Sequence, residues 1–290
     1  MLKLQRLSDC SLQVAVQAWN HGFQDYFVPI RLSTAAFVDR LSGEHLSPDH
    51  SLVALSKNEG AGLLLNGIEE IAGCKTAWNG GTAVLPSWRS QGVGRKLLLE
   101  ALQIYEDEGV ARATLEVIQE NERAFKLYQA VGYERRAELI CWERKTPWQS
   151  DAQALPSGIT LRRGSPRDLA ILSWYDEELP WQSHWSHIKD AEIWLAEEDG
   201  QLVGYALYRR QWDRQGCLQA LNVYQCQALP GHDRKTQILR SLLLRTLADG
   251  AGAPRLLALN FSGGERTSMG KLLTENGFNV YVRQWWMVKE

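Results

Sequence analysis

The chain has 290 residues, of which 44% are hydrophobic and 23% charged, and its formal net charge is −2. These values are typical of a folded globular protein long enough for two domains, and they exclude the dense basic surface expected of a protein that binds nucleic acid or anionic membranes. Because no apolar run could span a bilayer and the first residues lack the apolar block of a signal peptide, we expect a cytoplasmic protein. The 5 dispersed cysteines are typical of reduced thiols, and we expect no metal site.

The first quarter of the chain alternates strand and helix patterns. Residues 2–7 predict a strand, and a helical stripe and a second helix over 34–41 follow it. Between the helices stand three aromatic residues, Phe23, Tyr26 and Phe27, and aromatic side chains are typical of a packed core.

Three strand patterns come next. Residues 51–55 and 62–65 predict an antiparallel pair, and residues 76–84 predict a third strand. Within the third, Asn79-Gly80-Gly81 is either a hairpin tip or a bulge.

A glycine-containing turn joins this third strand to an amphipathic helix that runs from Gly94 to about residue 108. Gly92 and Gly94 allow backbone to approach a ligand closely, and the first amides of the helix have no partner within it. Arg89 and Arg95 add positive charge. The turn therefore predicts a phosphate site, although the same glycines could serve only tight helix packing.

The next segment has its own pattern. Residues 113–117 alternate as a strand that turns Glu116 away from the core, toward either solvent or a cleft. Asn121 is a predicted helix N-cap, and Tyr128 lies on the apolar stripe of the helix that follows.

From Trp78 to about Tyr133 these features, in this order, resemble the GNAT superfamily of acyl-CoA-dependent N-acyltransferases. The resemblance implies a mixed α+β fold, a mostly antiparallel twisted sheet flanked by helices, and acetyl-CoA as cosubstrate. It implies Tyr128 as the acid that protonates departing coenzyme A and Glu116 as the general base, although Tyr128 could simply pack and Glu116 could be solvated. The residues implied to bind the coenzyme are Thr82, Ala83, Val84, Arg89, Ser90, Gln91, Gly92, Val93, Gly94, Arg95 and Asn121. An amide near Val84 would face the thioester oxygen. The resemblance also places Phe23, Tyr26 and Phe27 beside the acceptor site, where they either contact a substrate or simply pack.

The pattern starts again after a turn-rich segment. We expect a first domain over 1–146 with the coenzyme site, a linker over 147–158 and a second, GNAT-like domain over 159–290 without it. The two halves align at an offset of 144 residues, so that Leu98 matches Leu242 and Leu99 matches Leu243. At this offset the glycines are lost, since Gly92 and Gly94 fall on Thr236 and Ile238.

Two residues with expected chemical roles also change. Glu116 falls on Asn260, and with one inserted residue Tyr128 falls on Leu273. We therefore predict a duplicated fold with one working coenzyme site.

The sequence leaves three functions open. The first is an N-acetyltransferase that acts on a primary amine of a small molecule or peptide. The second is an acyl-CoA-binding sensor with a protein partner, and the third is a nucleotide-binding module, which the absence of a Walker-type Gly-Lys-Ser/Thr motif disfavours. Acceptor and oligomeric state are not predicted.

Overall fold

The computed structural model describes residues 2–28, 30–57, 59–149 and 157–290. By contacts the chain divides into two compact units, residues 1–136 with 285–290 and residues 137–284. Of the expected linker, residues 150–156 lie outside the described residues. So does Asn58, in the turn that joins the antiparallel strands predicted at 51–55 and 62–65. In the described part of the chain, no helix has the length and apolar character needed to cross a membrane.

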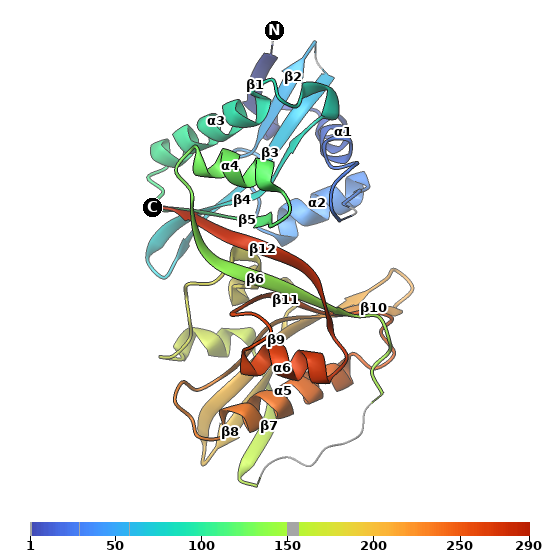
Figure 1. The fold of residues 1–290 in the computed structure, drawn as a ribbon, viewed down its shortest axis with the longest axis vertical. Coiled ribbons are helices and arrows are strands. Elements are labelled where there is room, and N and C mark those ends of the chain that lie inside the picture. The colour runs from blue at the N-terminus through green and yellow to red at the C-terminus, as the bar shows by residue number, and fades with distance from the viewer. Residues whose placement is uncertain (1, 29, 58, 150–156) are drawn as a thin grey trace. The chain divides into compact units, whose positions relative to one another are not determined.

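The first unit is a mixed α+β structure with helices beside a twisted sheet (Figure 1). Its strands follow the order β1-β2-β3-β4-β5 and continue with the end of β12. The elements are β1 (Leu2–Arg6), α1 (Leu12–Gly22), α2 (Thr34–Gly43), β2 (Leu52–Ser56), β3 (Glu59–Ile71), β4 (Cys74–Val84), α3 (Val93–Asp107), β5 (Arg112–Ile118) and α4 (Glu122–Gln129). The predicted second helix and the three predicted strands are thus confirmed.

Strand β4 contains a bulge, which resolves the ambiguity at Asn79-Gly80-Gly81. Its antiparallel register with β3 shifts there, because Leu65 pairs with Gly81 but Asn66 pairs with Asn79. The hairpin tip lies instead between β3 and β4. On its other side, β4 pairs in parallel with β5, and within the described residues that pairing ends at Asn79 and Leu115. Beyond this point the two strands form a fork.

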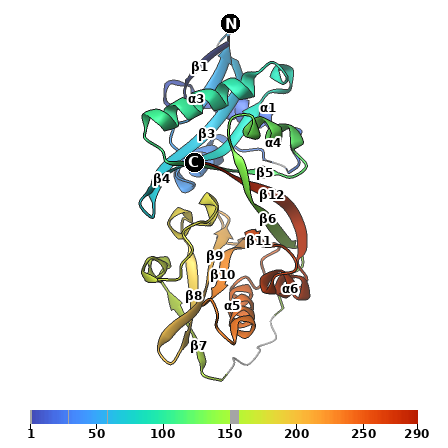
Figure 2. The same ribbon diagram turned by 60° about the vertical axis from the view of Figure 1, so that its left-hand side comes forward.

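The second unit repeats this plan with strand order β6-β11-β10-β9-β8-β7 (Figure 2). Short 3-10 segments between 166 and 187 stand where the first unit has α1 and α2. The elements are β6 (Glu134–Arg144), β7 (Ile159–Gly164), β8 (Glu192–Glu198), β9 (Gln201–Trp212), β10 (Leu218–Ala228), α5 (Lys235–Asp249), β11 (Leu256–Ser262), α6 (Ser268–Glu275) and β12 (Asn279–Lys289).

The offset between the halves is not constant. Both ends of β10 and of β11 lie 144 residues after those of β4 and β5, as predicted, but α5 lies only 142 residues after α3. The turn before α5 is therefore two residues shorter.

The packing of the two helices shows a smaller error in the predicted matches. Gly62 and Gly204, which pair with Val84 and Ala228, face Leu97 and Leu242 respectively. The predicted match of Leu98 with Leu242 is therefore wrong by one residue. The match of Leu99 with Leu243 is wrong as well, since Leu99 is 42% exposed and Leu243 is 0% exposed.

The C-terminal ends of the two halves are exchanged between the units. Met287 is fully buried in the core of the first unit, and Arg112 Nε forms an ion pair with Glu290 Oε1 at 3.1 Å. Residues 137–144 of β6 belong to the second unit, where Trp142 pairs with Ala258 of β11 and joins the core. The units therefore differ at their ends from the domains expected at 1–146 and 159–290.

Candidate active site

The fork between β4 and β5 opens into a pocket of about 480 Å³ within the first unit. Helix α3 contributes its N-terminal turn, α4 contributes Asn121 and Tyr128, and the segment after α1 contributes aromatic side chains. The predicted site residues that line it are Phe23, Tyr26, Phe27, Thr82, Val84, Arg89, Ser90, Gly92, Val93, Gly94, Arg95, Asn121 and Tyr128. Three predicted residues, Ala83, Gln91 and Glu116, are not among the described lining residues.

Two backbone amides of β4 face the fork. Leu85 N donates to Ala61 O at 3.1 Å, and alternation along an antiparallel pair then turns the amide of Ala83 toward β3 as well. The amides of Thr82 and Val84 consequently point away from β3. The sequence-based choice of an amide near Val84 agrees with this geometry, whereas buried Ala83 has its amide turned the other way.

The start of α3 is built for close approach by a ligand. Gly92 is the N-cap in the left-handed region, with φ 77°, and no atom lies within 4 Å of the place where its Cβ would stand. A Cβ at Gly94 would lie 3.3 Å from Leu127 Cδ2. Because the first amides of α3 have no partner within the helix, they are available for an anion. The predicted helix start is confirmed to within one residue.

Arg89 has a structural contact that the sequence did not indicate. Its Nε donates to Val84 O at 3.1 Å and its Nη2 donates to Gly22 O at 3.0 Å. The guanidinium therefore joins the end of β4 to the end of α1 while still lining the pocket. Gln91 is exposed and donates to Ser87 O at 2.7 Å.

The aromatic segment after α1 forms one wall. Phe23 and Tyr26 pack edge to face with ring centroids 5.0 Å apart, and Tyr26 and Phe27 do so at 5.4 Å. Tyr26 is also hydrogen-bonded to the Asn121 side chain. Asn121 caps α4 as predicted, since its Oδ1 accepts from Ala124 N at 3.2 Å. The segment is thus tied to the start of α4, and Phe27 keeps 55% of its surface exposed.

Tyr128 is a buried residue of the pocket lining. Burial raises the pKa of its hydroxyl to about 12, and a hydrogen bond with the Thr82 side chain partly offsets this increase. Thr82 is itself held by Asn79, whose Nδ2 donates to Thr82 Oγ1 at 2.9 Å. A tyrosine with this pKa is protonated at neutral pH and can donate a proton.

Glu116 lies on β5 with its carboxylate against the indole of Trp78. Trp78 Nε1 donates to Glu116 Oε2 at 2.8 Å, while Oε1 is enclosed and has no hydrogen-bond partner in the described part of the chain. Burial raises the pKa of Glu116 to about 7, Trp78 lowers it, and the charge of Glu44 raises it further. A carboxyl with this pKa is partly ionised at neutral pH, as a general base requires.

Sequence reasoning missed several residues of this region. Trp78 and Glu44 are next to Glu116 only in space, and no sequence pattern pairs them with it. Arg123 lines the pocket with Asn121 at the start of α4. In the sequence, its position two residues after the predicted cap Asn121 is the feature that could have indicated this.

The second unit lacks the residues that form this site. The N-cap of α5 is Arg234, which forms an ion pair with Glu198, where α3 has Gly92 as its N-cap. Ile238 faces Gly204 as Val93 faces Gly62, so the predicted counterparts Thr236 and Ile238 are wrong by one residue. The loss of both glycines is confirmed, because residues 232–249 contain none.

The substitution of Leu273 for Tyr128 is confirmed by the backbone. Tyr133 N donates to Tyr128 O, and Phe278 N donates equivalently to Leu273 O. Asn260 stands at the position of Glu116, since β5 and β11 correspond at 144 residues.

Comparisons with known proteins agree with this geometry. Residues 14–133 match the model of the acetyltransferase (GNAT) family. Over 59 residues the chain is 34% identical to a thialysine N-epsilon-acetyltransferase of Bos taurus, and this match spans 20% of the chain and 35% of the relative. The chain thus spans about a third of the length of that relative.

Solved structures resemble the whole chain. A GCN5-related N-acetyltransferase from Sphaerobacter thermophilus is 15% identical, with a TM-score of 0.71 over 100% of this chain and 95% of that one. A tandem GNAT protein from the clavulanic acid biosynthesis pathway is 16% identical, with a TM-score of 0.67 over 100% and 98%.

Fold and comparisons together define an α+β unit of the GNAT type followed by a second copy of the same fold. Within the first unit, residues 14–133 match the acetyltransferase (GNAT) family, and over its full length the chain has the fold of a tandem GNAT protein.

Proposed function

We propose that the first unit is an N-acetyltransferase that uses acetyl-CoA to acetylate a primary amine. The observation that carries this proposal is the fork between β4 and β5, where the outward amides of Thr82 and Val84 and the open N-terminus of α3 line one pocket with Tyr128. Acetyl-CoA would supply the acyl thioester.

The chain offers a group for each part of coenzyme binding. The first amides of α3, with Gly92 and Gly94, would hold the pyrophosphate, and Arg95 would add charge at the same end. The amides of Thr82 and Val84 would bind the pantetheine arm, and an amide at Val84 would stabilise the oxyanion. Holding the thioester in this position would lower the barrier by orientation.

Two side chains would move protons. Glu116, with a pKa of about 7, would take a proton from the acceptor ammonium directly or through water. Tyr128, protonated at neutral pH, would give a proton to the departing thiolate. Thr82 would position the Tyr128 hydroxyl through the hydrogen bond between them.

The carboxyl group of Glu116 favours a cationic acceptor. Glu44 also raises the pKa of Glu116, but Glu44 is itself ion-paired with Arg40 at 2.9 Å, so the negative charge open to an ammonium is that of Glu116. An ammonium group is attracted to such a site, and binding it would lower the pKa of Glu116. The partial match to a thialysine N-epsilon-acetyltransferase, whose name describes a side-chain amine acceptor, supports the same class.

The test is release of free thiol from acetyl-CoA with a panel of amino acids, polyamines, aminoglycosides and peptides, alongside calorimetry with acetyl-CoA alone. We expect binding in calorimetry and thiol release with at least one cationic amine. Binding without thiol release for any amine would contradict an enzyme and support an acyl-CoA sensor.

A further inference from the structure

The second unit keeps a pocket at the fork of its own sheet, although it has lost the glycine turn. Strands β10 and β11 pair in parallel up to Val223 and Ala258, and a bulge in β10 follows Val223. A pocket of about 210 Å³ opens beyond the fork. Its lining residues are Leu179, Ser183, Tyr224, Gln225, Cys226, Gln227, Lys235, Leu239, Asn260, Phe261, Ser262, Thr267, Ser268 and Met269.

One buried hydroxyl in this pocket has no partner. Ser183 is 1% exposed, and among the described residues its Oγ has no hydrogen-bond partner. The carbonyl oxygen of Ser183 is already engaged, because Gln225 Nε2 donates to it at 2.7 Å. Leaving a buried hydroxyl without a hydrogen bond destabilises the folded protein, and a ligand that accepts from it would remove this cost.

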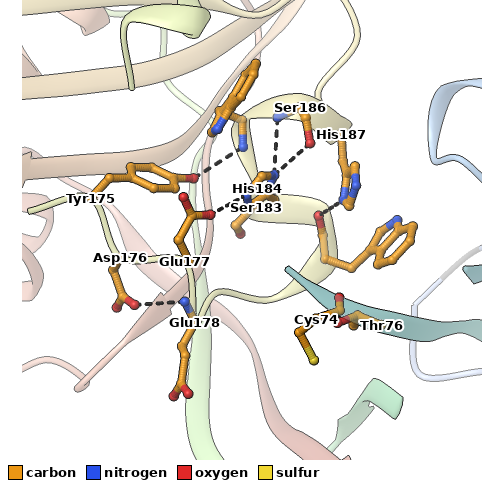
Figure 3. A network of polar contacts seen from close by, with 12 residues as sticks. Cys74, Thr76, Tyr175, Asp176, Glu177, Glu178, Ser183, His184, Ser186 and His187 are labelled. Carbon is orange, nitrogen blue, oxygen red and sulfur yellow. Dashed lines mark hydrogen bonds and ion pairs between the residues drawn. The ribbon is translucent and has the colours of Figure 1, made fainter. Parts of the chain in front are cut away.

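The segment that carries Ser183 is held by a network of polar contacts (Figure 3). Trp185 N donates to Tyr175 Oη at 3.4 Å, and Glu177 Oε2 lies 2.9 Å from His184 Nε2. His184 Nδ1 lies 2.7 Å from Ser186 Oγ. The hydroxyl of Ser183 is therefore presented by a fixed segment, and the pocket has this wall before any ligand binds.

Several other groups of the pocket can donate hydrogen bonds or carry positive charge. Asn260 uses its Oδ1 to accept from Gln284 Nε2 at 3.2 Å, and in the described chain no acceptor takes its Nδ2. Helix α6 begins at the pocket. The Thr267 hydroxyl caps the amide of Gly270, and the preceding amides of Ser268 and Met269 have no partner within the helix. Lys235, which is exposed at the start of α5, adds a positive charge, and the described lining residues include no Asp or Glu.

The shape of the pocket limits what these donors can bind. Leu179, Leu239 and Met269 provide an apolar wall. Its volume of about 210 Å³ is below the range of about 300–1,000 Å³ typical of pockets for larger ligands. At the start of α5, where a pyrophosphate would sit by analogy with the first unit, Arg234 and His232 are both bound to Glu198.

We propose that this pocket is a binding site for a small carboxylic acid anion with a short apolar chain. The carboxylate accepts hydrogen bonds from Ser183 Oγ, Asn260 Nδ2 and the first amides of α6, and Lys235 balances its charge. The apolar chain lies against the wall formed by Leu179, Leu239 and Met269. The site is separate from the proposed acetyl-CoA pocket and does not depend on acetyltransferase activity.

The experiment uses the full chain and sodium butyrate as the probe, with binding measured by saturation-transfer NMR and calorimetry. We expect one butyrate site whose affinity is unchanged when acetyl-CoA is present in excess. Butyramide, which has the same shape without the charge, should bind at least about tenfold more weakly because charge-assisted hydrogen bonds are lost.

Two variants locate the site. Ser183→Ala removes a hydroxyl that has no partner in the described chain, so the melting temperature should not fall while butyrate affinity drops several-fold. Lys235→Glu should weaken butyrate by about tenfold or more. Lys271→Glu is the matched control, because Lys271 is exposed on α6 and is not a lining residue, and it should leave affinity unchanged.

Several results would overturn the proposal. They are no butyrate binding, equal binding of butyramide, and affinity that neither Ser183→Ala nor Lys235→Glu reduces. Tighter binding of inorganic phosphate than of butyrate, or displacement of butyrate by coenzyme A, would assign the pocket to another ligand class.

Discussion

Trp78 Nε1 donates a hydrogen bond of 2.8 Å to Glu116 Oε2 and so connects β4 to β5 just where their pairing ends. The donor stabilises the ionised carboxylate, while burial and the charge of Glu44 favour the protonated form. Their balance gives Glu116 a pKa of about 7, the property on which its proposed role depends.

The first prediction concerns pH. If Glu116 is the base, kcat/KM should rise as pH increases through about 7 and level off above it, because only the ionised form accepts a proton. Glu116→Gln should lower kcat/KM by about 10²–10⁴ and remove this limb of the profile. Glu120→Gln, at an exposed position nearby in the sequence, is the control and should leave the profile unchanged.

The same group should affect stability with a defined sign. Since the folded state raises the pKa of Glu116 above its ordinary value of 4.5, the stabilisation from this carboxyl is present at low pH and is lost as pH rises through about 7. Chemical denaturation between pH 4.5 and about 7 should show a smaller decline in the free energy of unfolding for Glu116→Gln than for the wild type. An identical decline in both proteins would argue against a raised pKa.

Trp78→Phe tests the hydrogen bond itself. Without the indole donor the ionised carboxylate is less stable, so the pKa of Glu116 should rise and the activity limb should move to higher pH. The measurement is the pH profile of kcat/KM. A lower rate with an unmoved limb would mean that Trp78 contributes only packing.

Tyr128→Phe should reduce kcat by about 10²–10⁴ while acetyl-CoA binding measured by calorimetry survives, because only the proton donor is lost. Tyr133→Phe is a matched control. It also removes a buried tyrosine hydroxyl, but Tyr133 is not among the residues that line the pocket. Unchanged turnover in Tyr128→Phe would remove the assignment of Tyr128 as the acid.

The two arginines of the turn should behave differently. Arg89→Met removes two donors to the carbonyls of Val84 and Gly22, so both the melting temperature and acetyl-CoA affinity should fall. Arg95→Met should weaken acetyl-CoA binding in a salt-dependent way with little change in melting temperature. Equal melting temperatures for the two variants would contradict the bracing contact of Arg89.

Truncation should reveal the exchanged C-terminal ends. Met287 is 0% exposed in the core of the first unit, so Met287→Ala should cost about 2–5 kcal/mol in its unfolding free energy. A fragment of residues 1–146 lacks that side chain altogether and should be less stable than the same unit in the full chain. Differential scanning calorimetry distinguishes the two outcomes, and a fragment that melts like the intact unit would contradict the exchange.

The sequence alone predicted the features that depend on neighbouring residues. Gly92 and Gly94 indicated a turn that approaches a ligand, Asn121 indicated a helix cap, and the repeat indicated a second copy of the fold. Such signals are local, since backbone conformation and capping involve residues a few positions apart.

Only the tertiary structure paired Trp78 with Glu116, placed Met287 in the core of the first unit and gave Ser183 a pocket to face. It also showed that the turn before α5 is two residues shorter than the turn before α3, which a fixed offset does not reveal. Periodicity reports which side of an element is buried, but not which distant side chain lies against it, because strand order and chain ends are set by packing across the whole sheet.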